Sequence, residues 1–145
     1  MIKFKKGELT KLNSTTPIKM LVTDTKVGRN TKALVSTVLE KTSRHPLAMQ
    51  SIFNAIDSLS QELAMIVESP AVDELAVSEK EETLRDIMGM NQVLLQCIGV
   101  SHASIETVIR VTGNEKLVSK LTGAGGGGCV LTLIPTCILL FMHFC

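Results

Sequence analysis

Apolar side chains recur at steps of three and four residues through the middle of the chain, which predicts a series of amphipathic helices. The clearest run covers residues 47–67. Its inward positions are Ile52, Ala55, Ile56, Leu59, Leu63 and Ile66. We expect an earlier helix to begin near Asn30 or Thr31 and to close at Pro46, because proline lacks the amide that continues a helix.

The second half of the pattern predicts two more helices. Residues 68–77 are acidic and contain Pro70, so we expect a loop there. Ser78 and Glu81 have the spacing of a capping box, which predicts a helix start. Its apolar face would carry Leu84, Ile87, Leu94, Leu95 and Ile98. Asn91 falls on that face, where it must find hydrogen bonds, either to neighbouring backbone or to a substrate. A short helix is expected over residues 104–111.

The ends of the chain show strand patterns instead. We expect short strands at residues 2–4, 8–12 and 18–23, and two more on either side of a glycine cluster near residue 125. The predicted order is three strands, four helices, then strand, loop and strand. The sequence therefore predicts an α+β fold in layers.

The glycine cluster is the most informative segment. Five of the ten residues from Lys120 to Cys129 are glycine, half of the protein's ten glycines. Successive amides in such a turn can form a concave anion site. A flexible linker is the alternative, but linkers are long and polar, whereas apolar residues flank this cluster. The cluster matches neither a P-loop, since no Lys follows it, nor a dinucleotide fingerprint, since a strand follows. We expect a phosphate-associated loop.

Composition narrows the function classes. At 145 residues the chain has the length of one domain, and 45% hydrophobic residues suffice for a core. A net charge of +1 and the lack of Trp and Tyr argue against nucleic-acid binding. The four cysteines have no metal-binding spacing, so we interpret Cys97 and Cys129 as buried free thiols of a reducing compartment. No signal-peptide pattern is visible, and we expect a cytoplasmic protein.

Three further residues are candidates for anion binding. Lys26, Arg29 and Thr31 follow a predicted strand and precede a predicted helix, where amides, helix dipole and cationic side chains add together. The alternative is that Thr31 only caps the helix and the two bases are solvated. His102 has no nucleophile or acid at a useful spacing, so we interpret it as a structural residue before the 104–111 helix.

Three segments resemble the mevalonate kinase family, within the galactokinase, homoserine kinase, mevalonate kinase and phosphomevalonate kinase superfamily. Residues 119–129, SKLTGAGGGGC, are similar to the family's third motif. Residues 23–35, TDTKVGRNTKALV, are similar to its TNTKVPRNT-[RK]-ALV stretch, with Asp24 for Asn and Gly28 for Pro. MNQ at residues 90–92, followed by IGVSHAS at 98–104, is similar to a third stretch. The resemblance covers about residues 1–135, in the family's order.

The resemblance implies a partial kinase C-terminal domain over residues 1–135, with a ferredoxin-like sheet and packed helices, truncated at both ends. It implies ATP-binding residues, namely Thr122, Gly123, Ala124, Gly125, Gly126 and Gly127. It places Lys26, Arg29 and Thr31 near mevalonate. It also implies ATP and Mg²⁺ as the cofactors of the intact enzyme, and it leaves open whether that enzyme is a homodimer.

In the family, the catalytic Asp and Lys, the main ATP loop and the metal ligands all precede the matched region. We therefore expect no catalytic and no metal-binding residue here, and no phosphorylation of mevalonate by this chain alone. The competing interpretation is a non-catalytic protein whose helices bind a partner.

Residues 136–145 depart from the family pattern. They are almost wholly apolar, and ten residues are too few to span a bilayer, which needs about 20. We interpret them as an aberrant apolar tail that lowers solubility rather than as a membrane anchor.

Overall fold

A computed structural model describes residues 2–5, 7–14, 16–28 and 30–136. The tail over 137–145 and the candidate Arg29 therefore lie outside the described residues. The strands are β1 (Ile2–Lys5), β2 (Glu8–Lys11), β3 (Met20–Asp24), β4 (Ser119–Leu121) and β5 (Cys129–Leu133). The helices are α1 (Thr31–Arg44), α2 (Pro46–Glu68), α3 (Glu74–Ile98) and α4 (Ala103–Asn114). The predicted α+β order is confirmed.

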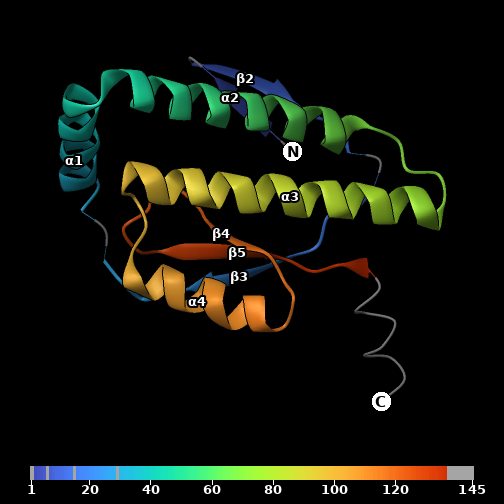
Figure 1. Cartoon of the computed structure of the whole chain (residues 1–145). Helices are drawn as coiled ribbons and strands as arrows, with labels where there is room; N and C mark the ends of the chain where they lie inside the picture. The colour runs from blue at the N-terminus through green and yellow to red at the C-terminus, as the bar shows by residue number, and fades with distance from the viewer. Residues whose placement is uncertain (1, 6, 15, 29, 137–145) are drawn as a thin grey trace.

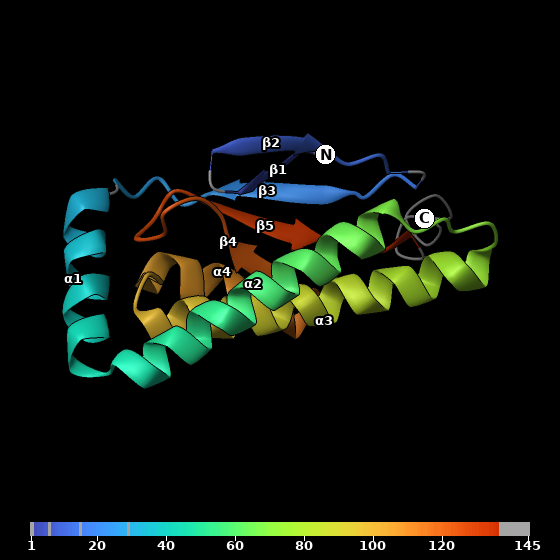
Figure 2. The ribbon, with the colours of Figure 1, turned by 90° about the horizontal axis from the view of Figure 1, so that it is seen from above.

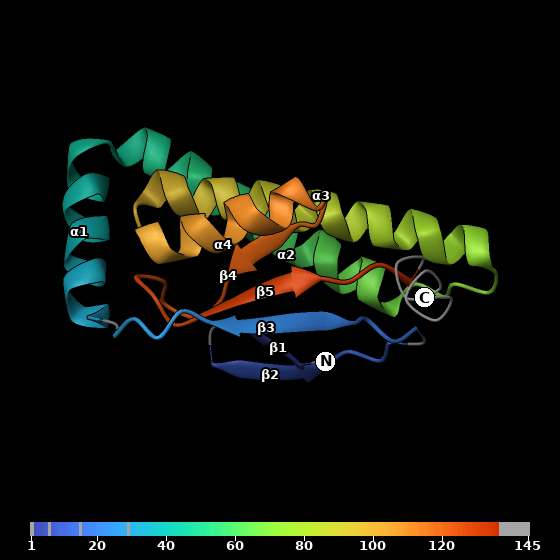
Figure 3. The same ribbon diagram turned by 90° about the horizontal axis from the view of Figure 1, so that it is seen from below.

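The sheet has the strand order β3-β5-β4, and both pairs are antiparallel. Figure 1 shows α2 and α3 side by side above this sheet, α4 against its lower side, and α1 standing across one end. β1 and β2 form a separate hairpin that lies behind α2 in this view. Leu12, just after the hairpin, packs on Ala64 and Val67 of α2. Seen from above and below, the sheet lies between the hairpin and the α3–α4 pair (Figures 2 and 3).

The central core joins all four helices to β4 and β5. Its buried members are Met49, Ile98, Val100, Ile105, Leu121 and Val130. Leu121 and Val130 are register partners on neighbouring strands, so one face of the sheet closes this core directly beside the glycine cluster. Packing therefore fixes the end of β4 and the start of β5, on the two sides of the loop.

The predicted start of α3 at the Ser78 capping box is wrong. The helix begins at Glu74, and the Asp73 carboxylate caps it by accepting a 2.7 Å hydrogen bond from the amide of Ala76. Asp is as strong a cap as Ser, and it stands nearer to Pro70, which stops the helical pattern upstream. The loop predicted over 68–77 accordingly shrinks to residues 69–73.

The other helix ends follow the sequence more closely. Asn30 caps α1, with its side-chain oxygen 3.1 Å from the amide of Ala33. His102 caps α4 through Nδ1, which accepts from the amide of Ser104, so the structural interpretation of His102 fits the fold. α4 runs three residues past the predicted end, to Asn114. No helix within the described ranges is long and apolar enough to cross a membrane.

Candidate phosphate-binding site

The glycine cluster forms a closed loop between two strands of the sheet. β4 leads into it and β5 leads out, and the amide of Thr122 donates to the carbonyl of Cys129 across 3.1 Å at the neck. The backbone inside has a positive φ at every glycine of the loop. The φ angles are +75° at Gly123, +82° at Gly125, +70° at Gly126, +135° at Gly127 and +76° at Gly128. This conformation favours glycine, because a Cβ would clash with the following carbonyl.

Three of these glycines, Gly125, Gly126 and Gly127, also lack room for a side chain. A Cβ on Gly125 would lie 2.1 Å from the carbonyl oxygen of Val100, which is backbone and cannot give way cheaply. A Cβ on Gly126 would lie 2.7 Å from Cδ1 of Leu34 on α1. The loop is therefore a packed part of the fold, and the linker alternative does not fit it.

The loop is anchored to the turn between α3 and α4. The amide of Gly126 donates to the carbonyl of Val100 over 2.8 Å. Val100 follows the left-handed Gly99 that ends α3, and Lys41 of α1 donates to the carbonyl of Cys97 in the last turn of that helix. The ends of α1 and α3 and the glycine loop thus form one connected unit.

The segment after β3 lies against the same loop. The amide of Thr25 donates to the carbonyl of Gly128 over 2.9 Å, and a Cβ on Gly127 would lie 2.8 Å from the carbonyl of Val27. Lys26 has φ of +56°, its amide donates to Asp24 Oδ1, and its Nζ lies 3.1 Å from Asp24 Oδ2. The Lys26 side chain is 86% exposed, so its ammonium can leave this surface ion pair at little cost.

Thr31 reaches the loop from the start of α1. It lines a shallow groove of about 220 Å³ together with Val100 and Ala124. The structure therefore brings Lys26 and Thr31, two of the three predicted substrate-proximal residues, to the predicted ATP-binding residues. The sequence predicted both groups separately, and their proximity is a finding of the fold.

The tip of the loop offers exposed backbone amides to a ligand. Gly123 and Ala124 are exposed at its tip, and no hydrogen bond inside the described part of the chain uses their amides. Two buried polar atoms that flank the stems also lack a partner there, Thr25 Oγ1 and Gln92 Nε2. Exposed amides in such a turn suit an anionic group. Among the described residues no three His, Cys, Asp or Glu side chains lie close enough together to hold a metal ion.

Gln92 is the site residue that the sequence analysis missed. It is 3% exposed, and its Oε1 accepts a 2.8 Å hydrogen bond from the amide of Leu121, the last residue before the loop. Asn91, the residue singled out on this helix, is only half-buried. The spacing of Leu84, Met88 and Gln92 at steps of four was the signal that places Gln92 on the inner face.

The prediction that Cys97 and Cys129 are buried is wrong. Cys97 is exposed and Cys129 is half-buried, although both are free thiols. Cys97 faces away from the core because the inner face of α3 is set by Gln92 and Leu95, five and two residues earlier.

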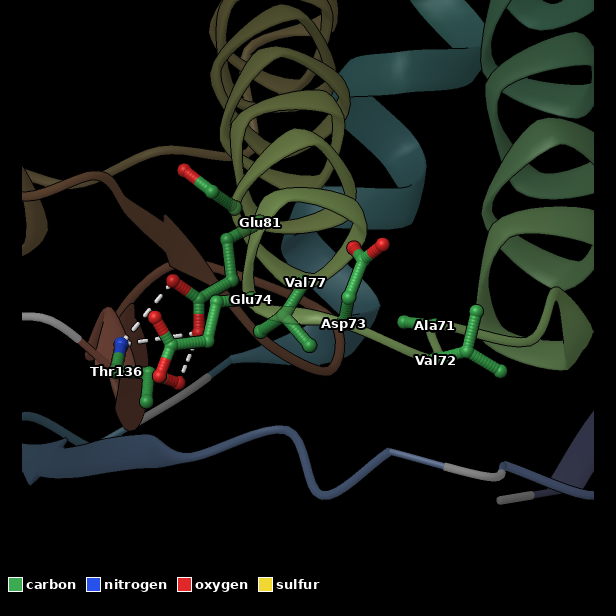
Figure 4. A pocket seen from close by; sticks show the side chains of 8 residues that line it. Ala71, Val72, Asp73, Glu74, Val77, Glu81 and Thr136 are labelled. Atoms are coloured by element: carbon green, nitrogen blue, oxygen red, sulfur yellow. Dashed lines mark hydrogen bonds between the residues drawn. The ribbon is translucent and has the colours of Figure 1, made fainter.

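A second hollow, of about 490 Å³, lies at the opposite end of α3 (Figure 4). Thr136 donates to the Glu81 carboxylate there through both its amide and its hydroxyl. Ala71, Val72 and Val77 complete an apolar wall. Because Glu81 is engaged by Thr136 and the hollow lies far from the glycine loop in Figure 1, it forms no part of the phosphate site.

Comparison with known proteins identifies the class of this fold and loop. Residues 41–136 match the family described as GHMP kinases C terminal, and the chain belongs to that family. The chain is 62% identical to the mevalonate kinase of Arabidopsis thaliana over 136 residues, which are 94% of this chain and 35% of that protein. It is 36% identical to the mevalonate kinase of Homo sapiens over 137 residues, or 92% and 33% of the two chains.

Solved structures agree at the level of the fold. A crystal structure of L. major mevalonate kinase in complex with R-mevalonate matches with a TM-score of 0.78 at 16% identity, over 93% of this chain and 40% of that one. The Methanococcus jannaschii mevalonate kinase matches with a TM-score of 0.69 at 24% identity, over 97% and 42%. The chain thus spans about a third of the length of the curated relatives that it matches.

Proposed function

We propose that this chain is the C-terminal part of a mevalonate kinase, which transfers the γ-phosphate of ATP to the 5-hydroxyl of mevalonate in isoprenoid and sterol biosynthesis. The observation that carries the proposal is the glycine loop. Its left-handed backbone, its contact with Val100 and its exposed tip fit a phosphate cradle, in a chain 62% identical to a mevalonate kinase. We further propose a cytosolic protein, since free thiols at Cys97 and Cys129 suit a reducing compartment.

In this proposal the chain's own residues bind and orient. Bound ATP supplies the phosphoryl group, and Mg²⁺ would accompany it with ligands that we do not assign within the chain. The amides of Gly123 and Ala124 face the phosphates, and packing against Val100 holds them in place. Lys26 and Thr31 border the same surface and would meet anionic groups of the substrates. Arg29 remains a candidate from the sequence for the same role.

We propose that the 145 residues alone do not phosphorylate mevalonate. Phosphoryl transfer needs both substrates in line and the charge on the transferred group neutralised, and one glycine loop supplies a fraction of that. ADP release from ATP and mevalonate by the purified chain should therefore stay at background.

A chimera tests the proposal directly. Residues 1–136 of this chain would replace the matching segment of the Arabidopsis thaliana mevalonate kinase. We expect mevalonate-dependent ADP release with kcat and KM within about tenfold of the parent, since most aligned positions are unchanged. A chimera that folds like the parent but does not phosphorylate mevalonate would contradict the proposal.

One observation favours the competing interpretation of a helical interaction protein. The outer faces of α2 and α3 form an apolar groove of about 540 Å³, in which Met90 and Val93 are 48% and 55% exposed. Light scattering of the purified chain distinguishes this interpretation from the kinase proposal. A stable assembly that Val93→Glu dissolves would show that this face buries a second copy of the chain, which the kinase proposal does not require.

A further inference from the structure

Helix α3 occupies the place of a neighbouring strand along the outer edge of β4. Two side chains of α3, seven residues apart, bond to the backbone of β4 and of the turn that precedes it. Arg85 donates to the carbonyl of Lys116 over 3.0 Å, and Gln92 accepts from the amide of Leu121 over 2.8 Å. An edge strand otherwise presents unpaired backbone groups, so these two bonds fix how β4 lies on the helix.

The bond from Gln92 is made at the critical end of the strand. Leu121 is 1% exposed and is followed at once by Thr122, whose amide closes the neck of the glycine loop on Cys129. The carbonyl of Leu121 accepts from the ammonium of Lys120 over 2.9 Å. Side chains therefore satisfy both outward-facing backbone groups of Leu121, and among the described residues Gln92 alone donates or accepts there from another element.

In the side-chain amide of Gln92, the oxygen has a hydrogen-bond partner and the nitrogen has none within the described residues. Its orientation follows from chemistry, because only the oxygen can accept from the Leu121 amide. Nε2 is then a buried donor with no partner in the described part of the chain. Burying an unpaired donor is costly. The hydrogen bond that Gln92 Oε1 accepts from the Leu121 amide therefore has to offset the cost of leaving Nε2 without a partner.

We propose that Gln92 is a positioning residue for the glycine loop, which fixes Leu121 and, through it, the amides that face the phosphates. This inference rests on the proposed function only for its catalytic consequence. The conformational part, a loop held by Gln92, stands on the contacts alone. Arg85 bonds to Lys116 in the turn before β4, away from the glycine loop, and takes no part in this positioning.

Hydrogen exchange on the 145-residue chain tests the conformational part. In Gln92→Met, which removes the acceptor, we expect the amides of Leu121 and Gly126 to exchange about tenfold faster, the factor for one ordinary hydrogen bond. Gln92→Glu keeps an oxygen that can accept from the Leu121 amide and should restore most of the protection. Arg85→Met is the matched control and should leave Gly126 unchanged.

Kinetics of the chimera test the catalytic part. We expect Gln92→Met to raise the KM for ATP about tenfold with little change in the KM for mevalonate, and Gln92→Glu to recover it. Met88→Ala, a core change on the same helix, controls for lost stability and should not split the two KM values.

The inference is overturned if Gly126 exchanges at the parent rate in Gln92→Met, or if Arg85→Met speeds it equally. A changed exchange rate with unchanged KM for ATP would overturn the catalytic part. A chimera without activity would instead count against the proposed function, and the exchange experiment would still decide whether Gln92 holds the loop.

Discussion

The amide nitrogen of Gly126 lies 2.8 Å from the carbonyl oxygen of Val100 and donates to it. The two residues are far apart in the chain, yet this bond joins the β4–β5 loop to the turn between α3 and α4. Val100 also belongs to the central core, so its bond to Gly126 attaches the loop to a close-packed part of the fold. A preorganised loop would bind phosphates without first being ordered, which is the physical basis of the proposed function.

The first prediction concerns Gly125. Changing Gly125 to Ala imposes an L-residue at φ +82° and a Cβ 2.1 Å from the Val100 carbonyl. We expect the free energy of unfolding to fall by about 2–5 kcal/mol, as measured by urea denaturation. Gly89→Ala is the control, because Gly89 lies inside α3 with nothing within 4 Å of its Cβ position. It should stabilise the chain by about 0.5–1 kcal/mol. Equal effects at the two glycines would refute the packed-loop description.

The second prediction concerns a buried chain of hydroxyl groups under the sheet. Thr132 and Ser119 lie 2.7 Å apart, Ser119 and Thr112 lie 2.7 Å apart, and Thr112 can donate to the carbonyl of Val108. Thr132→Val keeps the shape but leaves Ser119 with one partner fewer. We expect a loss of about 1–2 kcal/mol in urea denaturation. Thr37→Val on the exposed face of α1 should cost less, and a larger loss there would contradict this reasoning.

The third prediction concerns alkaline pH. Burial lowers the pKa of the Lys120 ammonium below its usual 10.5, so the fold disfavours the charged form relative to the unfolded chain. The unfolded chain then binds more protons between the folded pKa and 10.5, and Lys120 adds stability as the pH rises through that window. This stability is lost again as the pH falls through the folded pKa. The urea midpoint of the parent minus that of Lys120→Met should increase with pH. A difference that does not change with pH would contradict the prediction.

The sequence predicted what depends on local pattern. Steps of three and four placed all four helices, and the glycine cluster with its apolar flanks predicted a loop between strands. The start of α3 was wrong because two caps, Asp73 and Ser78, compete within five residues, and the pattern alone does not rank them.

The candidate site depends on contacts that the pattern of apolar and polar residues does not reveal. The carbonyl of Val100 has no sequence signature, since any residue offers one, so its bond to Gly126 became visible only in the fold. Gln92 was hidden for a related reason, because a buried Gln looks like a surface residue until its partner, the amide of Leu121, is known.

We propose that the glycine loop serves ATP-dependent phosphoryl transfer. The variants for its test are Gly126→Val, in the packed half of the loop, and Gly123→Ala, at the exposed tip where φ is +75°. Gly28→Ala is the control, because its Cβ position is open and φ is not left-handed. Thermal unfolding of each chimera would confirm that it folds.

The most direct measurement is kcat/KM for ATP in the mevalonate kinase chimera carrying these variants. We expect a loss of about 100-fold for Gly126→Val and a smaller loss for Gly123→Ala, because misplacing a positioning group by about 1 Å costs that much. Gly28→Ala should match the parent. Folded Gly126→Val and Gly123→Ala chimeras with the parent's kcat/KM for ATP would contradict the account and leave the loop as a structural turn.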